Sequence, residues 1–538
     1  MPAFTYEWDN FGGGYYVGPS AVNQPKNTWQ GANITLSDDD ATLVPTYEPQ
    51  KLTLTGTGTT SGVLSNGTSA TTWSEATYFN GYVVLMGATS TATYVYFIKT
   101  SDSTVTRVLL SVGGTDVTGV TLNTPPVVVP TTAGDVIAYV AVGKTAIYQI
   151  TRSSSAVAAW TPSGNTILLT GLTIWNARMI AWGSASDTVL FSDALTFAAN
   201  WSSLNFISVG YANDGISYCV PRNLDLLVVK PSGWYTITGV LGVNTAVRQL
   251  NDTLGILPTD PVEQHNNTAY FITSTGTNNY AVNLLAISGS RVDVAAYQRF
   301  GLSDSNITIS KTNMGYLAVA SVVEDTGLNQ YANIYLLNHQ DRWQVFKMPA
   351  SVAYNDSLKY AVARAQVSRY NTTQDQKIYL CESVTGASVN TMTIHAIRPT
   401  TVEPGKLSAS DAPTTATLKL QDVATKMPVI IRRVYVEAEM IQIPVSPYTG
   451  SASIQARVNN KAIGDIAFSQ TTGDVSSDLS TAYTFPYSTF TSVTNTSYSQ
   501  IRVLRFNVDD ATYGYTNEIE IQFAGLRIRR VWVEGDSR

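Results

Sequence analysis

The chain has 538 residues, of which only 13% are charged, and its formal net charge is −6 at pH 7. Proteins that grip nucleic acid through its phosphates are usually basic, so this charge argues against stable DNA binding. The chain contains 30 tyrosines among many Thr, Ser, Asn and Gly residues, and long Lys/Glu-rich stretches typical of helices are missing. β-branched and aromatic side chains fit a pleated sheet, so the composition predicts an all-β protein.

The N-terminal segment, residues 1–55, contains neither the basic region nor the apolar core of a signal peptide. No apolar run in the chain approaches the roughly 18 residues of a membrane helix, so we expect a protein made in a cytosol, without membrane insertion.

Pro and Gly at high density, as in Gly12-Gly13-Gly14, predict an irregular N-terminal arm over residues 1–55. Its isolated aromatic residues need partners. We expect an arm that clasps the following domain or a neighbouring subunit.

Short apolar strands repeat over residues 56–400 and are separated by polar turns, as hairpins require. One blade of this kind cannot bury both of its faces alone, so the repeats predict a β-propeller. We count six or seven repeats and predict six blades, because the first two lack a terminal Trp and fit one distorted blade. Trp182 and Trp234 recur after an apolar strand and are expected to lie buried between blades.

The C-terminal part begins with residues 401–416, which are rich in Pro, Thr and Ser and predict a linker. Strands resume over residues 417–538 and predict a small β-sandwich. The apolar parity of the last strand changes at Arg529-Arg530, and Arg432-Arg433 interrupts an earlier strand similarly. Such a change indicates either a β-bulge or the burial of both faces in turn. The paired arginines are either solvated edge charges or part of an interface.

No catalytic, cofactor-binding or metal-binding motif stands out, and we expect no enzyme, no cofactor and no metal. The nearest match to a sialidase Asp-box, Ser184–Phe191, lacks the glycine, and no pair of carboxylates for glycoside hydrolysis is evident. His265, His339 and His395 are isolated, without a second ligand at metal spacing.

Two acidic clusters and two cysteines complete the candidates for chemistry. Asp38-Asp39-Asp40 and Asp509-Asp510 lack the alternating oxygen ligands and the glycine of a calcium loop. We expect solvated turns there, with adventitious calcium as the alternative. Cys219 and Cys381 lie in apolar strand contexts and are expected to be free, buried thiols.

Three short segments occur in an order that is more specific than a generic propeller repeat. They are Phe191-Ser192-Asp193, Asn213-Asp214-Gly215-Ile216 and Leu227-Val228-Val229-Lys230. With the residues around them, 175–273, they resemble the propeller of bacteriophage virion proteins, above all the tail nozzle proteins of short-tailed phages. The resemblance is least regular over Asn244–Asp252.

The resemblance implies a structural component of a bacteriophage tail, assembled in the host cytoplasm and located in the virion. In nozzle proteins, several copies form a ring around the distal channel through which DNA leaves, and we expect a homo-oligomeric, hexameric ring. Other tail proteins, an adaptor and fibres, are the expected partners, and DNA is a partner only in transit. The alternative is a tail-tip protein that recognises a host receptor or glycan, because Tyr-, Asn- and Ser-rich loops suit adaptable binding.

A DNA conduit imposes one further expectation on the arginines. Lys and Arg in a channel would bind phosphates and slow DNA exit in a salt-dependent way. We therefore expect the Arg-rich strands Val429–Met440 and Gly525–Glu534 to lie away from the lumen. Their partners in subunit contacts would be carboxylates such as Glu437, Glu439 or Glu534.

Overall fold

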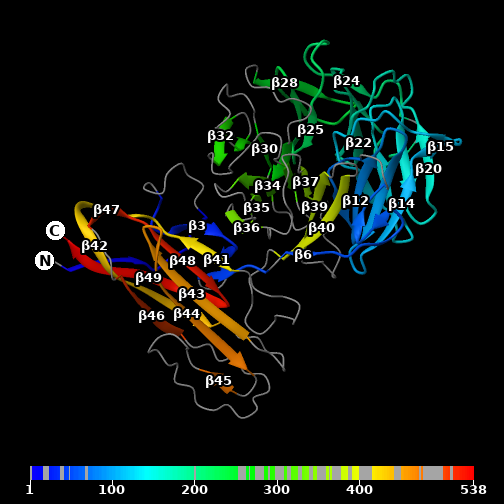
Figure 1. Cartoon of the computed structure of the whole chain (residues 1–538). Coiled ribbons are helices and arrows are strands. Elements are labelled where there is room, and N and C mark those ends of the chain that lie inside the picture. The colour runs from blue at the N-terminus through cyan, green and yellow to red at the C-terminus, as the bar shows by residue number, and fades with distance from the viewer. Residues whose placement is uncertain are drawn as a thin grey trace. The chain divides into compact units, whose positions relative to one another are not determined.

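The computed structural model of the chain (Figure 1) contains only strands, turns and loops in its described residues, and no helix among them. The all-β prediction is therefore confirmed. Most of the predicted linker lies outside the described residues, which are 3–15, 24–36, 42–47, 49–66, 71–198, 201–251, 262–265, 267–272, 284–288, 291–296, 308–311, 317–324, 330–337, 343–347, 359–362, 364–365, 377–385, 390–398, 415–440, 450–471, 474–476, 501–508 and 513–537.

The chain divides into two compact units, and each is assembled from segments that are distant in sequence. Unit 1 comprises Met1–Pro49, Asn333–Pro349 and Ile397–Arg538. Unit 2 comprises Gln50–Ala332 and Ala350–Ala396. The N-terminal and C-terminal segments of the chain therefore belong to the same unit.

Unit 2 is built from antiparallel sheets that follow one another along the chain, and four of them have four strands in simple chain order. Short turns join the strands: Asn176 and Ala177 have φ angles of 48° and 57° in the two-residue turn between Trp175 and Arg178, as a type I′ hairpin requires. The four sheets are β17 (Val127–Pro130), β18 (Val136–Val140), β19 (Ile147–Thr151) and β20 (Ala156–Trp160); β21 (Gly171–Trp175), β22 (Arg178–Trp182), β23 (Thr188–Phe191) and β24 (Phe206–Ser208); β25 (Tyr218–Pro221), β26 (Asp225–Lys230), β27 (Gly233–Thr238) and β28 (Ala246–Asn251); and β29 (Val262–His265), β30 (Thr268–Ile272), β31 (Leu284–Ser288) and β32 (Arg291–Ala296).

Three further sheets and one hairpin complete the description of unit 2. The sheet before β17 contains β7 (Thr55–Gly56), β10 (Thr72–Trp73), β11 (Thr77–Phe79), β12 (Tyr82–Ala88), β13 (Thr93–Lys99) and β14 (Thr104–Leu109), and the hairpin is β15 (Ser111–Val112) with β16 (Thr115–Asp116). After β32 come β33 (Thr308–Lys311) with β34 (Leu317–Glu324), and then β37 (Lys359–Val362) and β38 (Arg364–Ala365) before β39 (Ile378–Thr385) and β40 (Asn390–Ile397). The sheet of β37, β39 and β40 is completed by β6 (Gln50–Lys51), β8 (Thr59–Thr60) and β9 (Val63–Leu64) from the start of the unit.

The first strands of successive sheets contact each other in order, from β11 through β17, β21, β25, β29 and β33 to β37. The short strand β38 then pairs in parallel with β11, so the series closes on itself. The described residues place seven sheets in this series, and the predicted six blades are not confirmed. β12 pairs with β11 and β13, whereas β18 pairs with β17 and β19, so the first two repeats are separate sheets. Aliphatic side chains such as Val84, Met86, Val128 and Val140 pack between them, so a terminal Trp is not required.

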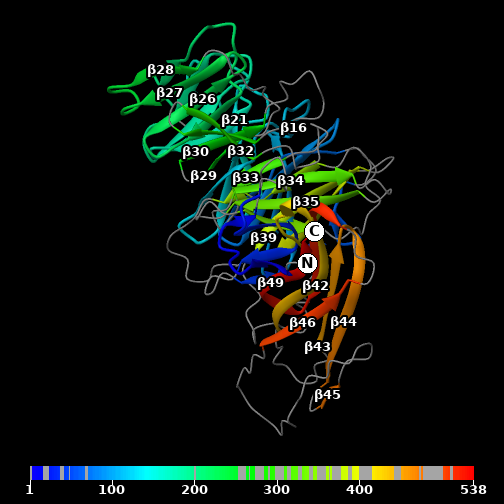
Figure 2. The ribbon, with the colours of Figure 1, turned by 90° about the vertical axis from the view of Figure 1, so that its left-hand side faces the viewer.

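Tryptophan side chains fill the junctions between neighbouring sheets in residues 175–273. Trp182 is 2% exposed, and its Nε1 donates to the Ser217 carbonyl oxygen, 3.2 Å away, next to the following sheet. Trp234 is 1% exposed, and its ring meets that of Phe271 in the next sheet edge-on, with centroids 4.8 Å apart. Figure 2 shows Trp234's strand β27 between β26 and β28. The predicted burial of both tryptophans between sheets is confirmed.

Unit 1 contains two mainly antiparallel sheets whose buried side chains form one apolar cluster. The first sheet contains β36 (Trp343–Lys347), β4 (Ile34–Leu36), β5 (Leu43–Pro45), β49 (Leu526–Ser537), β42 (Val423–Met440) and β46 (Ile501–Asn507), with β1 (Ala3–Trp8) paired to β49, β47 (Gly514–Asn517) paired to β42, and residues 333–337 of β35 (Gln330–Leu337) paired to β36. The second contains β2 (Gly14–Tyr15), β3 (Thr28–Ala32), β41 (Ala416–Lys419), β48 (Ile519–Ala524), β43 (Gly450–Val458), β44 (Lys461–Thr471) and β45 (Asp474–Ser476), and Figure 2 shows the long strands β43 and β44 side by side.

The N-terminal segment is not irregular in its described residues. β1 pairs with β49 along its whole length, from Ala3 opposite Asp536 to Trp8 opposite Val531. Trp8, Phe11 and Trp29 are fully buried in the core of unit 1. The predicted irregular arm is therefore wrong for these residues, and their aromatic side chains pack on the C-terminal strands. The local Pro and Gly content predicts irregular backbone, but pairing of β1 with the distant strand β49 gives this segment regular strand structure.

Both paired-arginine interruptions are β-bulges. In the pairing of β42 with β49, the register skips Arg432 on β42 and Arg529 on β49. A bulge inserts one extra residue and so restores the face on which the following side chains lie. The four apolar residues around Arg529-Arg530 are consequently all buried in the same core: Leu526, Ile528, Val531 and Val533. The β-bulge alternative is confirmed.

The Trp234→Ala variant should lose about 3–5 kcal/mol of unfolding free energy, because the truncation leaves a cavity between two sheets. Leu224→Ala is the matched control: Leu224 is 84% exposed, so its truncation should change stability by at most about 0.5 kcal/mol. Urea unfolding of both full-length variants, followed by far-ultraviolet circular dichroism, measures the difference. Equal stabilities would show that the junction between these sheets does not depend on the indole.

Candidate functional site

Ser192 and Asp193, from the first of the three segments that carry the resemblance, hold the end of β23 in place inside unit 2. The Ser192 hydroxyl accepts a hydrogen bond from the Met179 N–H (2.9 Å) and donates to the Asp193 carbonyl oxygen (2.8 Å). The Asp193 carboxylate accepts from the Asn205 amide nitrogen at 3.0 Å. These contacts connect β22, β23 and the loop that leads to β24.

Lys230 holds the connection between β24 and β25 in place from a buried position. Its side chain is fully buried, and Nζ donates to the carbonyl oxygens of Val209 (2.5 Å) and Tyr211 (3.2 Å). Burial lowers the pKa of Lys230, and the Asp214 carboxylate, 3.9 Å from Nζ, opposes that shift. Asp214 also accepts from the Ser232 hydroxyl. The lysine therefore holds the segment between two sheets in place.

Gly215 completes this connection because no side chain fits there. A Cβ at this position would lie 1.8 Å from the Ser184 carbonyl oxygen. The second and third segments thus meet where the sheet of β21–β24 adjoins the sheet of β25–β28, through Lys230, Asp214 and Gly215. Ser192 and Asp193 lie after β23 and bond within the sheet of β21–β24. They position the sheets and leave no reactive group in an open site.

The other chemical candidates also have structural surroundings. Asp187, in the Asp-box-like segment, accepts from the Thr188 hydroxyl at 3.1 Å in a turn. His395 lies 2.7 Å from the buried Glu382 carboxylate, and His265 is buried. Within the described residues, no group of three or more His, Cys, Asp or Glu side chains is arranged to hold a metal ion. His339, Asp38-Asp39-Asp40 and Asp509-Asp510 lie outside the described residues.

Both cysteines are free and buried, as predicted. Burial raises the pKa of Cys219 well above its usual value and raises that of Cys381 to about 12. The thiolate is the nucleophilic form of cysteine. Neither thiol is therefore suited to nucleophilic chemistry near neutral pH.

An exposed apolar surface is the most unusual feature of unit 2. Among the described residues, nine of the fourteen exposed large hydrophobic side chains fall between residues 168 and 247. Seven of these nine belong to three neighbouring connections, β23–β24, β25–β26 and β27–β28, or to the strand residues that follow them. We call these seven the apolar end; they are Leu195, Leu204, Phe206, Leu224, Val240, Val243 and Val247.

Antiparallel pairing explains why these residues gather at one end of the two sheets. The β21–β22, β23–β24, β25–β26 and β27–β28 connections all leave their strands at the same end, because successive strands alternate in direction. The Leu195 N–H donates to the Ala177 carbonyl oxygen at 2.7 Å, which joins two of these connections. Leu241, in the β27–β28 connection, is buried in the same cluster as Phe191 at the end of β23.

Two arginines near the apolar end lie beside carboxylates of the same chain. Arg222 forms two hydrogen bonds of 2.6 Å with the Asp225 carboxylate. Arg178 lies 3.9 Å from Asp193. Exposed apolar surface often marks an interaction site, and here the close Arg222–Asp225 pair would not oppose burial of that surface. The sequence analysis missed this surface, although Leu195, Leu204, Leu224, Val240 and Val243 are apolar residues in otherwise polar connections.

The arginines of the unit 1 bulges are paired with carboxylates of the same chain. Arg529 donates to Glu439 at 2.9 Å, and Arg530 contacts both Glu437 and Glu7 at 2.9 Å. Arg433 lies 3.4 Å from Glu534. Glu437, Glu439 and Glu534 are the carboxylates named in the sequence analysis, but here they pair with these arginines within one chain and not across a subunit contact. The expected placement of these arginines in subunit contacts stays a prediction.

Comparison with known proteins gives no assignment: no family model matches the chain, and no curated protein matches its sequence. None of the described residues forms a helix long and apolar enough to cross a membrane.

The Glu439→Gln variant should lose about 1–3 kcal/mol of stability, because the Arg529 guanidinium would keep a neutral partner at a mostly buried position. The Glu439 side chain is only 5% exposed. Glu534→Gln is the matched control, because the Arg433–Glu534 pair is 48% and 40% exposed, and such pairs contribute about 0–1 kcal/mol. Urea unfolding compares the two. A larger loss for Glu534→Gln would contradict the assignment of the buried pair as the stabilising one.

Proposed function

We propose that this protein is a structural component of a bacteriophage tail, namely the nozzle ring that forms the distal DNA-exit channel. The apolar end of unit 2 is the observation that carries the proposal. It lies within the segment that resembles nozzle proteins, and it offers an uncharged surface for assembly. The expected assembly is a homo-oligomeric, hexameric ring in the virion tail, with adaptor and fibre proteins as neighbours.

The architecture supports a rigid building block. We interpret the closed series of seven sheets in unit 2 as a β-propeller, and the two sheets of unit 1 as a β-sandwich. Completion of the last sheet by N-terminal strands resists opening of the series, because separating the sheets would break backbone hydrogen bonds as well as apolar contacts. A particle component that must withstand DNA passage benefits from such closure.

We assign the apolar end to contact with a second copy of this chain. Burying exposed apolar side chains is favourable by about 25 cal/mol per Å², and stable interfaces have apolar centres that exclude charge. The intramolecular Arg222–Asp225 pair keeps its partners when the surface is covered. A neighbour of the same kind could thus cover Leu204, Leu224 and Val243 without leaving a buried charge unpaired.

The charge distribution supports passage of DNA without retention. The chain has 33 basic against 39 acidic residues. Arg432, Arg433, Arg529 and Arg530 each have a carboxylate partner in the same chain. Paired arginines attract phosphates less than free ones, because the carboxylate offsets the field that phosphates would feel.

The second candidate function is host recognition by a tail-tip protein. A small pocket in unit 2, lined by hydroxyl, amide and aromatic side chains, favours it. A recognition protein would bind a receptor through such a pocket and need not form a ring around DNA. The oligomeric state and the ligand can be measured separately.

The Leu204→Asp/Val243→Asp double variant should disrupt assembly while leaving the fold of the chain intact. Both side chains are about 80% exposed (80% and 81%), so the substitutions are tolerated in a monomer, whereas a carboxylate in an apolar interface carries a desolvation cost. We expect a ring for the unmodified chain and at least tenfold weaker association for the variant, measured by light scattering after size-exclusion chromatography and by negative-stain electron microscopy.

Met427→Asp, at an exposed apolar residue of unit 1 outside the apolar end, is the matched control and should assemble normally. A monomeric unmodified chain at high concentration would contradict the nozzle proposal. Normal rings from the double variant would show that the apolar end is not the subunit contact.

The assembled protein should bind duplex DNA only weakly near physiological salt, because its 39 acidic residues outnumber its 33 basic ones and binding to phosphates depends on basic side chains that release counterions. Fluorescence anisotropy of a labelled duplex, titrated at several salt concentrations, measures both affinity and salt dependence. Tight binding that weakens steeply with salt would refute a conduit that lets DNA pass and would favour a ring that grips it.

A further inference from the structure

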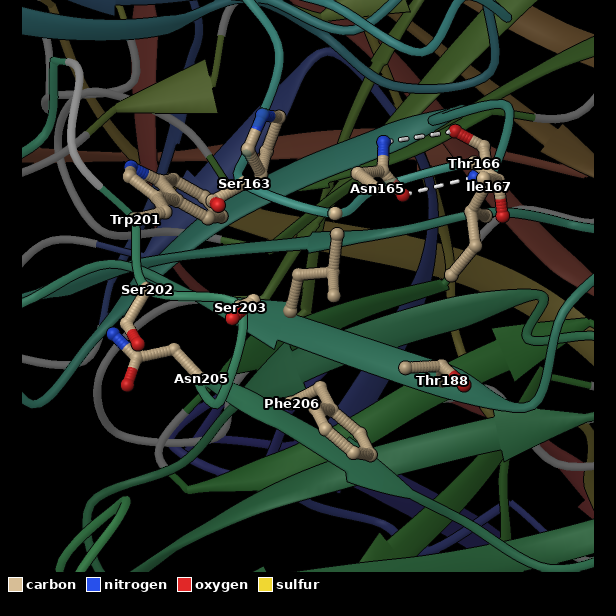
Figure 3. A pocket seen from close by; sticks show the side chains of 13 residues that line it. Ser163, Asn165, Thr166, Ile167, Thr188, Trp201, Ser202, Ser203, Asn205 and Phe206 are labelled. Atoms are coloured by element: carbon tan, nitrogen blue, oxygen red, sulfur yellow. Dashed lines mark hydrogen bonds between the residues drawn. The ribbon is translucent and has the colours of Figure 1, made fainter.

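A pocket of about 180 Å³ lies in unit 2 between two connections. One side is formed by the segment between β20 and β21, and the other by β23 and the loop that leads into β24. Figure 3 shows Ser163, Asn165 and Thr166 on one side and Ser203 and Phe206 on the other. The Ser163 N–H donates to the Trp201 carbonyl oxygen at 3.2 Å, so the two connections are bonded to each other beside the pocket.

The walls of the pocket are held in place before any ligand arrives. The Asn165 amide nitrogen donates to the carbonyl oxygens of Thr145 (2.9 Å) and Ile167 (3.1 Å), and its oxygen accepts from the Ile167 N–H (2.9 Å). The Trp201 ring is buried, and its Nε1 donates to the Phe197 carbonyl oxygen at 3.2 Å. Such prior bonding lowers the ordering cost of binding.

Three hydroxyl groups in the lining remain available. Ser163, Thr166 and Ser203 form no side-chain hydrogen bond with other described residues, and all three are exposed. Each hydroxyl can donate one hydrogen bond and accept others. Phe206, which is 50% exposed, adds an apolar ring at the edge of the pocket. Together they combine hydrogen-bonding groups with an aromatic surface.

The lining also excludes whole classes of ligand. None of its thirteen residues is charged at neutral pH. Phosphates and carboxylates are usually bound by Arg, Lys or helix N-termini, and divalent cations by carboxylates or imidazoles. A ligand that fits must therefore be neutral, rich in hydroxyl groups, and apolar on one face. A sugar ring has these properties.

We propose that this pocket binds one ring of a neutral saccharide. Its volume is below the roughly 300–1,000 Å³ of pockets that enclose larger ligands, so a single ring is the appropriate size. The few polar contacts and the small contact area place the dissociation constant in the millimolar range. This site goes beyond the nozzle proposal and does not depend on it, because one chain contains the whole pocket.

The test uses the full chain and saturation-transfer difference NMR, which detects millimolar binding to a large protein. The probes are glucose, galactose and N-acetylglucosamine, together with their methyl glycosides, with glucose 6-phosphate and glucuronic acid as charged counterparts. We expect transfer to at least one neutral sugar and weaker transfer to its charged counterpart. Binding of a methyl glycoside would identify the ligand as the end of a glycan chain, whereas loss on capping would identify a free sugar.

The Ser163→Ala/Ser203→Ala variant should weaken that binding about tenfold, because two hydrogen bonds to the ligand are lost. Ser101→Ala, at an exposed serine outside the pocket, is the matched control and should bind as the unmodified chain does. The absence of transfer to every neutral sugar, or equal binding by the double variant, would overturn the proposal. Ring assembly is measured separately, so failure of the saccharide site leaves the nozzle proposal intact.

Discussion

The structure of unit 2 depends on burial of apolar side chains between successive sheets. Each sheet has two apolar faces, and a neighbour on each side is needed to remove both from water. β26 shows the consequence: Leu226, Leu227, Val228 and Val229 are all fully buried, although consecutive residues point to opposite faces. A continuous apolar run of this kind is expected of a strand covered on both faces. Closure of the series by β38 and by the N-terminal strands extends the same protection to the first and last sheets.

Polar residues between positions 191 and 230 also support the packing of successive sheets, because they hold the connections between them. Sheets packed on both faces must still be connected by chain that crosses between them, and the backbone groups of that chain need partners. Lys230 supplies two donors to such carbonyl oxygens from inside the protein. Gly215 permits the close backbone approach that brings this chain against Ser184. Lys230 and Asp214 are therefore structural parts of the junction between the sheets of β21–β24 and β25–β28.

In unit 1, arginines lie at the β-bulges that interrupt two long strands. Long strands curve and twist, and a strict alternation over the length of β42 or β49 would turn apolar residues away from the core. The bulges at Arg432 and Arg529 reset the alternation and leave charged side chains at the interruptions. Those charges pair with carboxylates of the neighbouring strand, and Arg530 also lies over the Trp532 ring, 4.7 Å from its centroid. These arginines are therefore largely compensated by carboxylates within the fold.

Two surfaces of unit 2 are candidates for recognition. The apolar end and the hydroxyl-lined pocket are both formed by connections, while the strands between them supply rigidity. Connections tolerate apolar or polar substitution more readily than buried strands, so recognition can develop there without loss of the sheets. The two surfaces differ in chemistry and share Phe206, and we propose a second copy of the chain for the one and a neutral ligand for the other.

The sequence by itself determined the all-β class, the burial of Trp182 and Trp234 and the buried thiols, and it reduced the paired arginines to two alternatives, between which the strand pairing decided for the β-bulge. Each of these follows from local patterns: alternation, its interruption, and apolar residues next to turns. Only the tertiary structure decided the number of sheets, because aliphatic packing separates the first two repeats where a tryptophan was expected. It also decided the place of the N-terminal segment, whose first strand, β1, pairs with residues more than 500 positions away, such as Trp8 with Val531. The apolar end and the pocket could not be predicted from the sequence for the same reason: each combines connections that become neighbours only when the sheets pack.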